Sequence, residues 1–438
     1  MARQYFGTDG VRGVAGDVLS ADLALRLGRA AALQSAAAAP RVLVIRDTRE
    51  SGDMLEAALA AGIASAGGEV LLGGVLPTPA APLLIGRYGF DLGVVISASH
   101  NPYADNGIKF FGPDGFKLTD EAEEAIEARL DEIPEVGRTG LGRVRALHGT
   151  LEDYVRELHT RFAALDLSAV DVVIDCANGS TYKAAPEIFR RLGATPTVLA
   201  DTPDGRNINE RCGSTHLDAL AAVVRDGGHD LGFAFDGDGD RVLAVDRTGA
   251  TVDGDELIAL IALHLRAAGR LPGDGVAVTV MTNYGFHGAM EQAGVEVAIT
   301  GVGDRYVLEA LREKGWSLGG EQSGHIIDMG FVPSGDGIAS ALLTLEALAG
   351  ADLAARQGMH KLPQRLVNVP VGDRDAVMAD AGLQAAIAAE DTVLAGRGRV
   401  LVRPSGTEQL VRVMVEAPDA AETDAVCERL VAIVRNLG

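Results

Sequence analysis

The chain has 438 residues, with 39 Lys or Arg against 61 Asp or Glu and a formal net charge of −22. This length exceeds what one hydrophobic core usually supports, so several domains are expected. The acidic balance argues against nucleic acid or an anionic membrane surface as a general partner. Three cysteines without metal-ligand spacing, and a start without a basic-then-apolar segment, lead us to expect a cytoplasmic protein.

A strand, a helix, a glycine and a second strand follow one another three times along the chain. The first strands of these repeats are expected at 42–45, 172–174 and 276–280. Crossover helices that end at glycine are typical of α/β layers. After residue 361 the pattern changes to strands and one amphipathic helix, which predicts a smaller α+β domain.

The fold class expected from this pattern is α/β, with three related α/β domains of mixed sheets and a C-terminal α+β domain around a central cleft. The expected domain bounds are 1–150, 151–250, 251–360 and 361–438.

A polar turn, Ser-Ala-Ser-His-Asn-Pro at 97–102, directly follows the apolar run 92–96. The turn is expected to present a hydroxyl at the exposed tip of a buried strand, with Lys109 within reach. A serine beside a cation and oriented donors suits a nucleophile or a covalent phosphoryl carrier. An ordinary polar strand-to-loop turn explains this segment alone equally well.

Asp236, Asp238 and Asp240 alternate with glycine after another apolar run. Glycine lets the backbone wrap closely, so the carboxylates can converge on one hard cation. A calcium EF-hand loop is excluded because its sixth and twelfth positions would be Arg241 and Arg247 instead of Gly and Glu. Oxygen ligands of this kind favour magnesium, with a solvated acidic turn as the alternative.

Two later loops also fit phosphate and sugar chemistry. Glycine-framed Glu321, Ser323 and His325 suit sugar hydroxyls, although an ordinary glycine-rich turn has the same composition. The loop from Arg403 to Glu408, with Arg412 beyond it, combines two guanidiniums, two hydroxyls and a glycine. That set is typical of a phosphate cradle, with a surface turn carrying an ion pair as the alternative.

Together these segments resemble the alpha-D-phosphohexomutase superfamily over essentially the whole chain. Further matching segments are residues 5–13, 106–111, 207–209 and 303–306. Gln322 and the serine-rich turn resemble the glucosamine branch of the superfamily. One departure is Gln409, where the superfamily usually has proline after Thr-Glu.

The resemblance implies a role for each matching residue. It makes Ser99 the phosphoserine, His100 and Lys109 proton-transfer groups, and Arg12 a contact of the transferring phosphate. One Mg²⁺ per subunit would be held by Ser99 together with Asp236, Asp238 and Asp240. The substrate would be held by a larger set: Asp304, Arg305, Glu321, Ser323, His325, Arg403, Ser405, Gly406, Thr407 and Arg412.

The activity that the resemblance implies is interconversion of glucosamine 6-phosphate and glucosamine 1-phosphate, an isomerase reaction. Glucosamine 1,6-bisphosphate would be intermediate and activator, and the product would supply UDP-N-acetylglucosamine for cell-wall precursors. The implied partner is a small hexosamine phosphate, with no nucleic acid or membrane, and a homodimer is consistent with the branch. Alternatives are a glucose or mannose phosphate mutase, a metal-dependent sugar phosphatase and a non-enzymatic sugar-phosphate binder.

Overall fold

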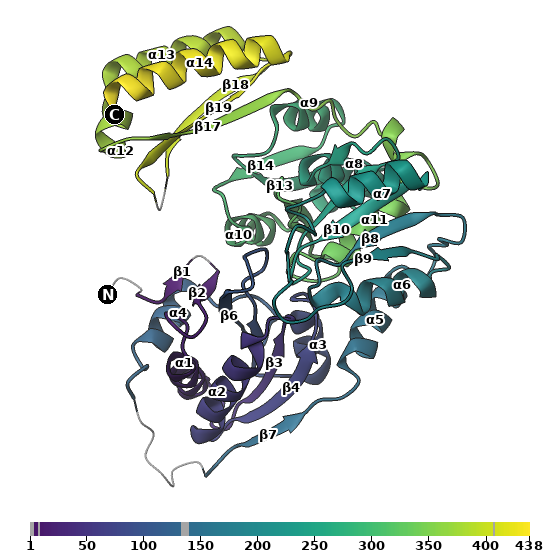
Figure 1. The fold of residues 1–438 in the computed structure, drawn as a ribbon, viewed down its shortest axis with the longest axis vertical. Coiled ribbons are helices and arrows are strands. Elements are labelled where there is room, and N and C mark those ends of the chain that lie inside the picture. Colours follow the sequence, from purple (N-terminus) through teal and green to yellow (C-terminus); the bar gives the residue numbers. More distant parts are fainter. Residues whose placement is uncertain (1–3, 8, 133–139, 406–407) are drawn as a thin grey trace. The chain divides into compact units, whose positions relative to one another are not determined.

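The structure, a computed structural model, describes residues 4–7, 9–132, 140–405 and 408–438 (Figure 1). The chain divides into two compact units. The first comprises Met1–Val280 and Ala298–Arg356, and the second comprises Met281–Val297 and Gln357–Gly438. Within the described ranges, no helix is long and apolar enough to cross a membrane.

The first unit opens with a mixed sheet in the order β1-β2-β6-β5-β3-β4-β7. Its central strands β3 and β5 are buried apolar runs, as is typical of strands covered on both faces. Helices α1 and α2 cover one face of β3 and β4, and α3 lies on the other (Figure 1). The strands are β1 (Phe6–Gly7), β2 (Gly10–Val14), β3 (Arg41–Arg46), β4 (Glu69–Val75), β5 (Leu92–Ile96), β6 (Asp105–Phe111) and β7 (Arg143–Ala146). The helices are α1 (Ala21–Gln34), α2 (Ser51–Ser65), α3 (Ala80–Tyr88) and α4 (Asp120–Glu127).

A second mixed sheet has the order β12-β11-β10-β8-β9. Strand β10 runs parallel to β8 and antiparallel to β11, so the chain turns tightly between β10 and β11 at the aspartate-glycine segment. The strands are β8 (Val172–Asp175), β9 (Thr197–Leu199), β10 (Leu231–Phe235), β11 (Val242–Asp246) and β12 (Thr251–Val252). The helices are α5 (Thr150–Arg161), α6 (Ala184–Arg191) and α7 (Asp218–Gly227).

A third sheet has the order β14-β13-β15-β16, with β13 and β15 parallel and β15 and β16 antiparallel. The glycine-framed loop expected to contact a sugar joins β15 to β16. The strands are β13 (Gly275–Thr279), β14 (Glu296–Thr300), β15 (Leu318–Gly320) and β16 (Ile326–Asp328). The helices are α8 (Gly254–Ala267), α10 (Asp304–Lys314) and α11 (Gly337–Leu348).

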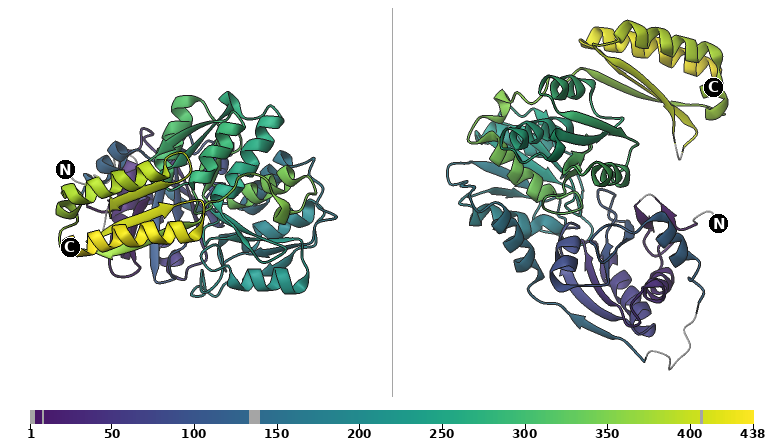
Figure 2. Two further views of the ribbon diagram at one scale, coloured as in Figure 1. Left: turned by 90° about the horizontal axis from the view of Figure 1, so that it is seen from above. Right: turned by 180° about the vertical axis from the view of Figure 1, so that it is seen from behind.

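The second unit contains an antiparallel sheet in the order β17-β19-β18. Helices α13 and α14 lie side by side on one face of these strands (Figure 2). Helix α9 joins this unit because Asn283, at its N-terminus, donates to the carbonyl of Leu362 at 3.0 Å. The strands are β17 (Gln364–Pro370), β18 (Arg399–Pro404) and β19 (Leu410–Glu416), and the helices are α9 (Tyr284–Gln292), α12 (Arg374–Ala379), α13 (Ala381–Leu394) and α14 (Ala420–Leu437).

The expected fold class is confirmed, with mixed α/β sheets and a smaller C-terminal α+β part. The first strands expected for the three repeats correspond to β3, β8 and β13. The ends of β5, β10 and β15 lead into the serine turn, the aspartate segment and the glycine-framed loop respectively.

Candidate active site

Ser99 lies in the turn after β5 with φ of 53°, in the left-handed region that non-glycine residues rarely occupy. It is 1% exposed, so the expectation of an exposed serine hydroxyl is wrong, although Pro102 at the end of the turn is exposed. The turn is covered because the aspartate segment of the second sheet packs onto it. The Ser99 hydroxyl donates to Asp236 Oδ2 at 2.5 Å, which directs the side chain toward the carboxylates.

Asp236, Asp238 and Asp240 come together directly after β10. Each offers a carboxylate oxygen, and these oxygens lie within 4.8 Å of one another in buried surroundings. Glycine is required at position 237, because a Cβ there would lie 2.6 Å from the Ser99 carbonyl oxygen. The structure therefore brings the predicted serine and the predicted metal ligands into one cluster.

The charge of this cluster calls for a cation. Burial, followed by the neighbouring carboxylates of Asp238 and Asp240, raises the pKa of Asp236 well above its usual value. Among the described residues, Asp238 Oδ1 and Asp240 Oδ1 are buried and accept no hydrogen bond. Buried carboxylate oxygens that lack donors, held on one tight turn, fit Mg²⁺, which binds through a few carboxylates and keeps sites for water or phosphate.

Lys109 on β6 is the cation that faces the aspartates. Its Nζ lies 2.9 Å from Asp238 Oδ2, 3.1 Å from Asp9 Oδ2 and 3.8 Å from Asp240 Oδ2. Burial alone would lower the pKa of Lys109, but these carboxylates outweigh it and raise the pKa. Lys109 is therefore protonated at neutral pH, with 1% of the residue exposed.

His100 follows Ser99 and is held as a neutral imidazole. Arg241 Nη1 donates to His100 Nδ1 at 3.1 Å, and Ser99 Oγ lies 3.4 Å from the same nitrogen. Burial, followed by the positive charges of Arg241 and Arg12, lowers the pKa of His100 to about 4. The imidazole is thus uncharged and next to the serine at neutral pH.

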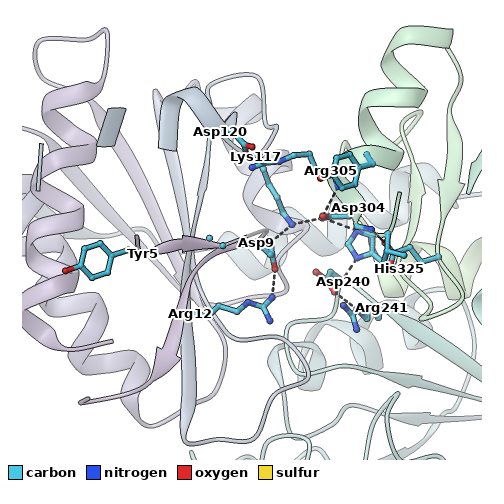
Figure 3. A pocket seen from close by; sticks show the side chains of 16 residues that line it. Tyr5, Asp9, Arg12, Lys117, Asp120, Asp240, Arg241, Asp304, Arg305 and His325 are labelled. Atoms are coloured by element: carbon cyan, nitrogen blue, oxygen red, sulfur yellow. Dashed lines mark hydrogen bonds and ion pairs between the residues drawn. The ribbon is translucent and has the colours of Figure 1, made fainter. Parts of the chain in front are cut away.

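A cavity of about 440 Å³ opens beside this cluster (Figure 3). Asp9, Arg12 and Lys117 approach from the first sheet, and Asp304 and His325 approach from the third. Lys117 joins the two sides, because its Nζ contacts Asp9 Oδ1 and lies 2.5 Å from Asp304 Oδ2. The other lining residues are Tyr5, Gly7, Gly10, Asp120, Asp240, Arg241, Val302, Gly303, Arg305, Tyr306 and Glu321. The cavity is lined by both cationic side chains and carboxylates. Cations can bind an anionic group, and carboxylates can accept hydrogen bonds from sugar hydroxyls.

Some of the residues predicted to bind the sugar line the cavity, and others support the residues that line it. Glu321 lines the cavity and accepts from the Gly303 amide at 3.0 Å, while Ser323 Oγ donates to Glu321 Oε2 at 3.2 Å. Gln322 does not line the described cavity, and its amide donates to Asp253 Oδ2 at 3.1 Å. Gln322 therefore supports the loop from the side of helix α8.

His325 links the cavity to the aspartate cluster. Its Nε2 lies 3.7 Å from Asp304 Oδ2, and its Nδ1 lies 3.6 Å from Asp240 Oδ1. Burial alone would lower the pKa of His325, but the Asp240 carboxylate outweighs it and raises the pKa. The Gly335 amide donates to Nε2 at 3.2 Å, so the ring proton of neutral His325 lies on Nδ1, which faces Asp240.

The predicted phosphate cradle lies in the second unit. Arg403 on β18 and Arg412 on β19 are partners across the strand pair, so both guanidiniums stand at one site of the sheet. Ser405 Oγ accepts from the Glu408 amide at 3.3 Å, while Gly406 and Thr407 lie outside the described residues. Arg374 also contacts this loop, donating to the carbonyls of Ser405 and Glu408.

Sequence reasoning missed Asp9, Lys117 and Arg374 as members of these sites. Asp9 stands inside the matched segment 5–13, so the resemblance could have indicated it. Lys117 and Arg374 stand in loops without a recognisable pattern, and their roles depend on contacts with distant segments.

The chain belongs to the phosphoglucomutase/phosphomannomutase family, within the alpha-D-phosphohexomutase superfamily. Family models match alpha/beta/alpha domain I at residues 3–136, domain II at 152–249, domain III at 253–367 and the C-terminal domain at 366–433. Curated relatives carry a more particular name. Phosphoglucosamine mutase of Moorella thermoacetica is 52% identical, covering 99% of this chain and 100% of that protein. Phosphoglucosamine mutase of Desulforudis audaxviator is 50% identical, covering 99% and 98%.

Solved structures share the fold. A phosphoglucomutase/phosphomannomutase family protein of Burkholderia thailandensis superposes with a TM-score of 0.84 at 26% identity, covering 99% of this chain and 97% of that chain. N-acetylphosphoglucosamine mutase of Aspergillus fumigatus, solved with GlcNAc-6P and magnesium, has a TM-score of 0.71 at 19% identity, covering 99% and 96%. At that identity the second likeness shows the fold alone.

Proposed function

We propose that the protein interconverts glucosamine 6-phosphate and glucosamine 1-phosphate as an intramolecular phosphotransferase. Phosphoglucosamine mutases that are about half identical over nearly the whole chain support the substrate. The observation that carries the reaction is the buried Ser99 hydroxyl, 2.5 Å from Asp236 in the aspartate cluster. A nucleophile beside a cation site and a charged cavity suits phosphoryl transfer.

In the forward direction Ser99 begins as phosphoserine. The bond between phosphorus and Ser99 Oγ breaks as a bond forms from phosphorus to the sugar O1, and O1 gives up its proton. The resulting 1,6-bisphosphate reorients in the site. Its C6 phosphoryl group is then transferred to Ser99 Oγ, as the bond between phosphorus and O6 breaks and O6 takes a proton. We assign the acceptance of the O1 proton to the neutral imidazole of His100, and the protonation of O6 to the ammonium of Lys109, which regains its proton from His100.

Asp236, Asp238 and Asp240, with Ser99, would hold Mg²⁺. When bound, the cation neutralises negative charge on phosphoryl oxygens. Lys109 and Arg12 supply further positive charge from the first sheet, and Arg12 is itself anchored by Asp9. We assign Arg12 to the transferring phosphate because it lines the cavity.

Asp304, Arg305, Glu321 and His325, which line the cavity, are proposed to bind the sugar hydroxyls, with Ser323 supporting Glu321. Paired Arg403 and Arg412, with Ser405, Gly406 and Thr407, are proposed to bind the phosphate that is not reacting.

We further propose that the chain has four domains, which end at residues 150, 250, 360 and 438, and that the protein is a homodimer. Light scattering of the purified protein measures the oligomeric state.

The proposal is tested by intact mass measurement and turnover of the wild type and Ser99→Ala. We expect wild-type protein to carry one phosphoryl group, located on Ser99 by peptide mapping, and Ser99→Ala to carry none and to lose turnover by about 10⁴-fold or more. Thr160→Ala, which removes an exposed hydroxyl on helix α5 that donates to the Arg156 carbonyl, serves as the control and should retain both properties. Full activity in Ser99→Ala contradicts the assignment.

A further inference from the structure

Arg49 has a buried guanidinium that the proposed chemistry does not use. It is 0% exposed, which is rare for arginine unless the group is fully paired. Its Nε lies 2.9 Å from Asp47 Oδ2, so the charge is balanced. The remaining nitrogens face the connection from β5 to β6 and, among the described residues, donate to backbone carbonyls there.

These carbonyls belong to the residues around Ser99. Arg49 Nη2 donates to the carbonyls of Ser99 and Asn101, both at 2.9 Å. Its Nη1 donates to Asp105 O at 2.9 Å and also to Pro102 O. One planar guanidinium thus holds three carbonyls of the turn and one at the start of β6, which the fixed fork of arginine donors allows.

Asn209 reaches the same turn from a different part of the chain. Its Nδ2 donates to Ser99 O at 2.9 Å and to Asn101 O at 3.1 Å. Arg49 lies in the segment matched by family domain I, and Asn209 lies in the segment matched by domain II. Two side chains from two domains therefore converge on the same two carbonyls. Asn209 belongs to the matched segment 207–209, to which the proposed reaction assigns no role.

The turn requires such support because Ser99 has a left-handed backbone with φ of 53°. A non-glycine residue in this region is strained and persists only where the surroundings fix it. The amide side of the turn is fixed as well, since Ser99 N donates to Ser97 Oγ at 3.0 Å and Ser97 Oγ donates to Asp47 Oδ2 at 2.5 Å. Asp47 and Arg49 thus hold both the amide and the carbonyl of the serine.

We propose that Arg49 and Asn209 are positioning residues, which fix the backbone of the turn so that the Ser99 oxygen faces the aspartate cluster. This inference rests on the proposed function, in which Ser99 carries the phosphoryl group. Neither side chain lines the described cavity beside the cluster, so their loss should slow phosphoryl transfer without weakening sugar binding. A misplacement of about 1 Å costs roughly 100-fold in rate.

Asn209→Ala is the first test, with Asn207→Ala as its matched control. Asn207 stands two residues away, and among the described residues its side chain bonds within its own loop, donating to Thr202 O and accepting from the Asp204 amide. We expect Asn209→Ala to lower kcat by about 100-fold while KM for glucosamine 6-phosphate stays within about threefold. The control should retain both constants. A kcat for Asn209→Ala within about threefold of the control overturns the inference.

Arg49→Lys is the second test, because it keeps the charge beside Asp47 but cannot reproduce the planar set of donors. Arg46→Lys is its control, since Arg46 is the last residue of β3, three positions before Arg49, and pairs with the exposed carboxylate of Asp53. We expect the phosphorus NMR signal of phosphoserine 99 to shift or broaden in Arg49→Lys and Asn209→Ala, and to stay unchanged in both controls. A role in stability alone would lower the melting temperature and leave this signal and kcat unchanged.

The outcomes separate this inference from the function on which it rests. If wild-type protein carries no phosphate on Ser99 under turnover, the proposed function fails. If Ser99 is phosphorylated and Ser99→Ala is inactive, yet Asn209→Ala and Arg49→Lys keep wild-type kcat, only the positioning role fails. If Arg49→Lys does not fold, Asn209→Ala alone tests the positioning role, because it removes two hydrogen bonds and no charge.

Discussion

At the scale of single residues, Asp238 meets two requirements at once. It belongs to the aspartate cluster, and its Oδ2 accepts from Lys109 at 2.9 Å and from Thr78 Oγ1 at 2.7 Å. Those contacts occupy Oδ2, while Oδ1 is buried and accepts no hydrogen bond among the described residues. The carboxylate thus holds Lys109 with one oxygen and offers the other to a cation.

Asp238→Asn should therefore weaken Mg²⁺ binding by about 10–100-fold, because one carboxylate of the cluster loses its charge. Titration calorimetry of the purified protein measures this affinity, and activity should partly return at higher Mg²⁺ concentration. Asp175→Asn is the matched control, since Asp175 is equally buried at the end of β8 but accepts from backbone amides. Unchanged Mg²⁺ affinity in Asp238→Asn contradicts the cluster as a metal site.

The residues that could be predicted from the sequence are those with a local pattern. Ser99 follows an apolar strand, and Asp236 to Asp240 alternate with glycine, so each segment signals its chemistry alone. Lys117 and Arg49 carry no such pattern. Lys117 meets Asp304 across 187 positions of sequence, and Arg49 meets Ser99 across 50. Their importance follows from chain topology, which single-sequence periodicity does not contain.

At the scale of elements, helix α11 begins at a buried carboxylate, Asp336. Its Oδ1 accepts from the Ala339 amide at 2.9 Å, and Tyr154 donates to both carboxylate oxygens. Burial nonetheless dominates and raises the pKa of Asp336 from its ordinary 3.8 to about 7. The native state therefore holds a proton there that the unfolded chain releases at lower pH.

The free energy of unfolding of the first unit should therefore include a contribution that is complete below pH 3.8 and is lost as pH rises toward about 7. Its slope is about −1.4 kcal/mol per pH unit within that window. Asp336→Asn should flatten this slope and keep the helix cap. Urea unfolding between pH 5 and 8, followed by fluorescence of the buried Trp316, measures it. Equal slopes in the two proteins contradict the raised pKa.

The strand pair β18–β19 places Arg403 and Arg412 opposite each other. If both guanidiniums grip a phosphate without contacting the sugar, Arg412→Ala should raise KM for every accepted hexose phosphate by a similar factor, about tenfold or more. Kinetics on glucosamine, glucose and mannose 6-phosphates at one Mg²⁺ concentration measure this. A loss confined to one sugar assigns Arg412 to sugar recognition instead.

Most strands could be predicted from apolar runs, because β3, β5 and β8 are buried and need continuous apolar residues. The grouping of helix α9 with the second unit could not be predicted from the sequence. This grouping depends on the hydrogen bonds from Asn283 to the Leu362 carbonyl and from the Tyr284 amide to Glu416. The local sequence pattern of the helix does not predict those contacts.

At the scale of the whole molecule, a mutase must keep the phosphoryl group of its phosphoserine away from water. Ser99, Lys109 and the three aspartates are at most 4% exposed, so transfer would take place in buried surroundings. Exclusion of water prevents hydrolysis of a reactive phosphoryl group and strengthens the electrostatic contacts around it. Burial of the transferring group suits a mutase, which must return the group to sugar, better than a phosphatase, which must admit water.

The most direct test of this account is a phosphorus NMR time course with wild-type protein, Mg²⁺ and glucosamine 6-phosphate, primed with a trace of hexose 1,6-bisphosphate. The account predicts that the 6-phosphate signal is replaced by that of glucosamine 1-phosphate, up to the same ratio reached when starting from the 1-phosphate. Inorganic phosphate should not accumulate, and Ser99→Ala should produce no change. Steady release of inorganic phosphate, or conversion of glucose or mannose 6-phosphate but not of glucosamine 6-phosphate, would contradict it.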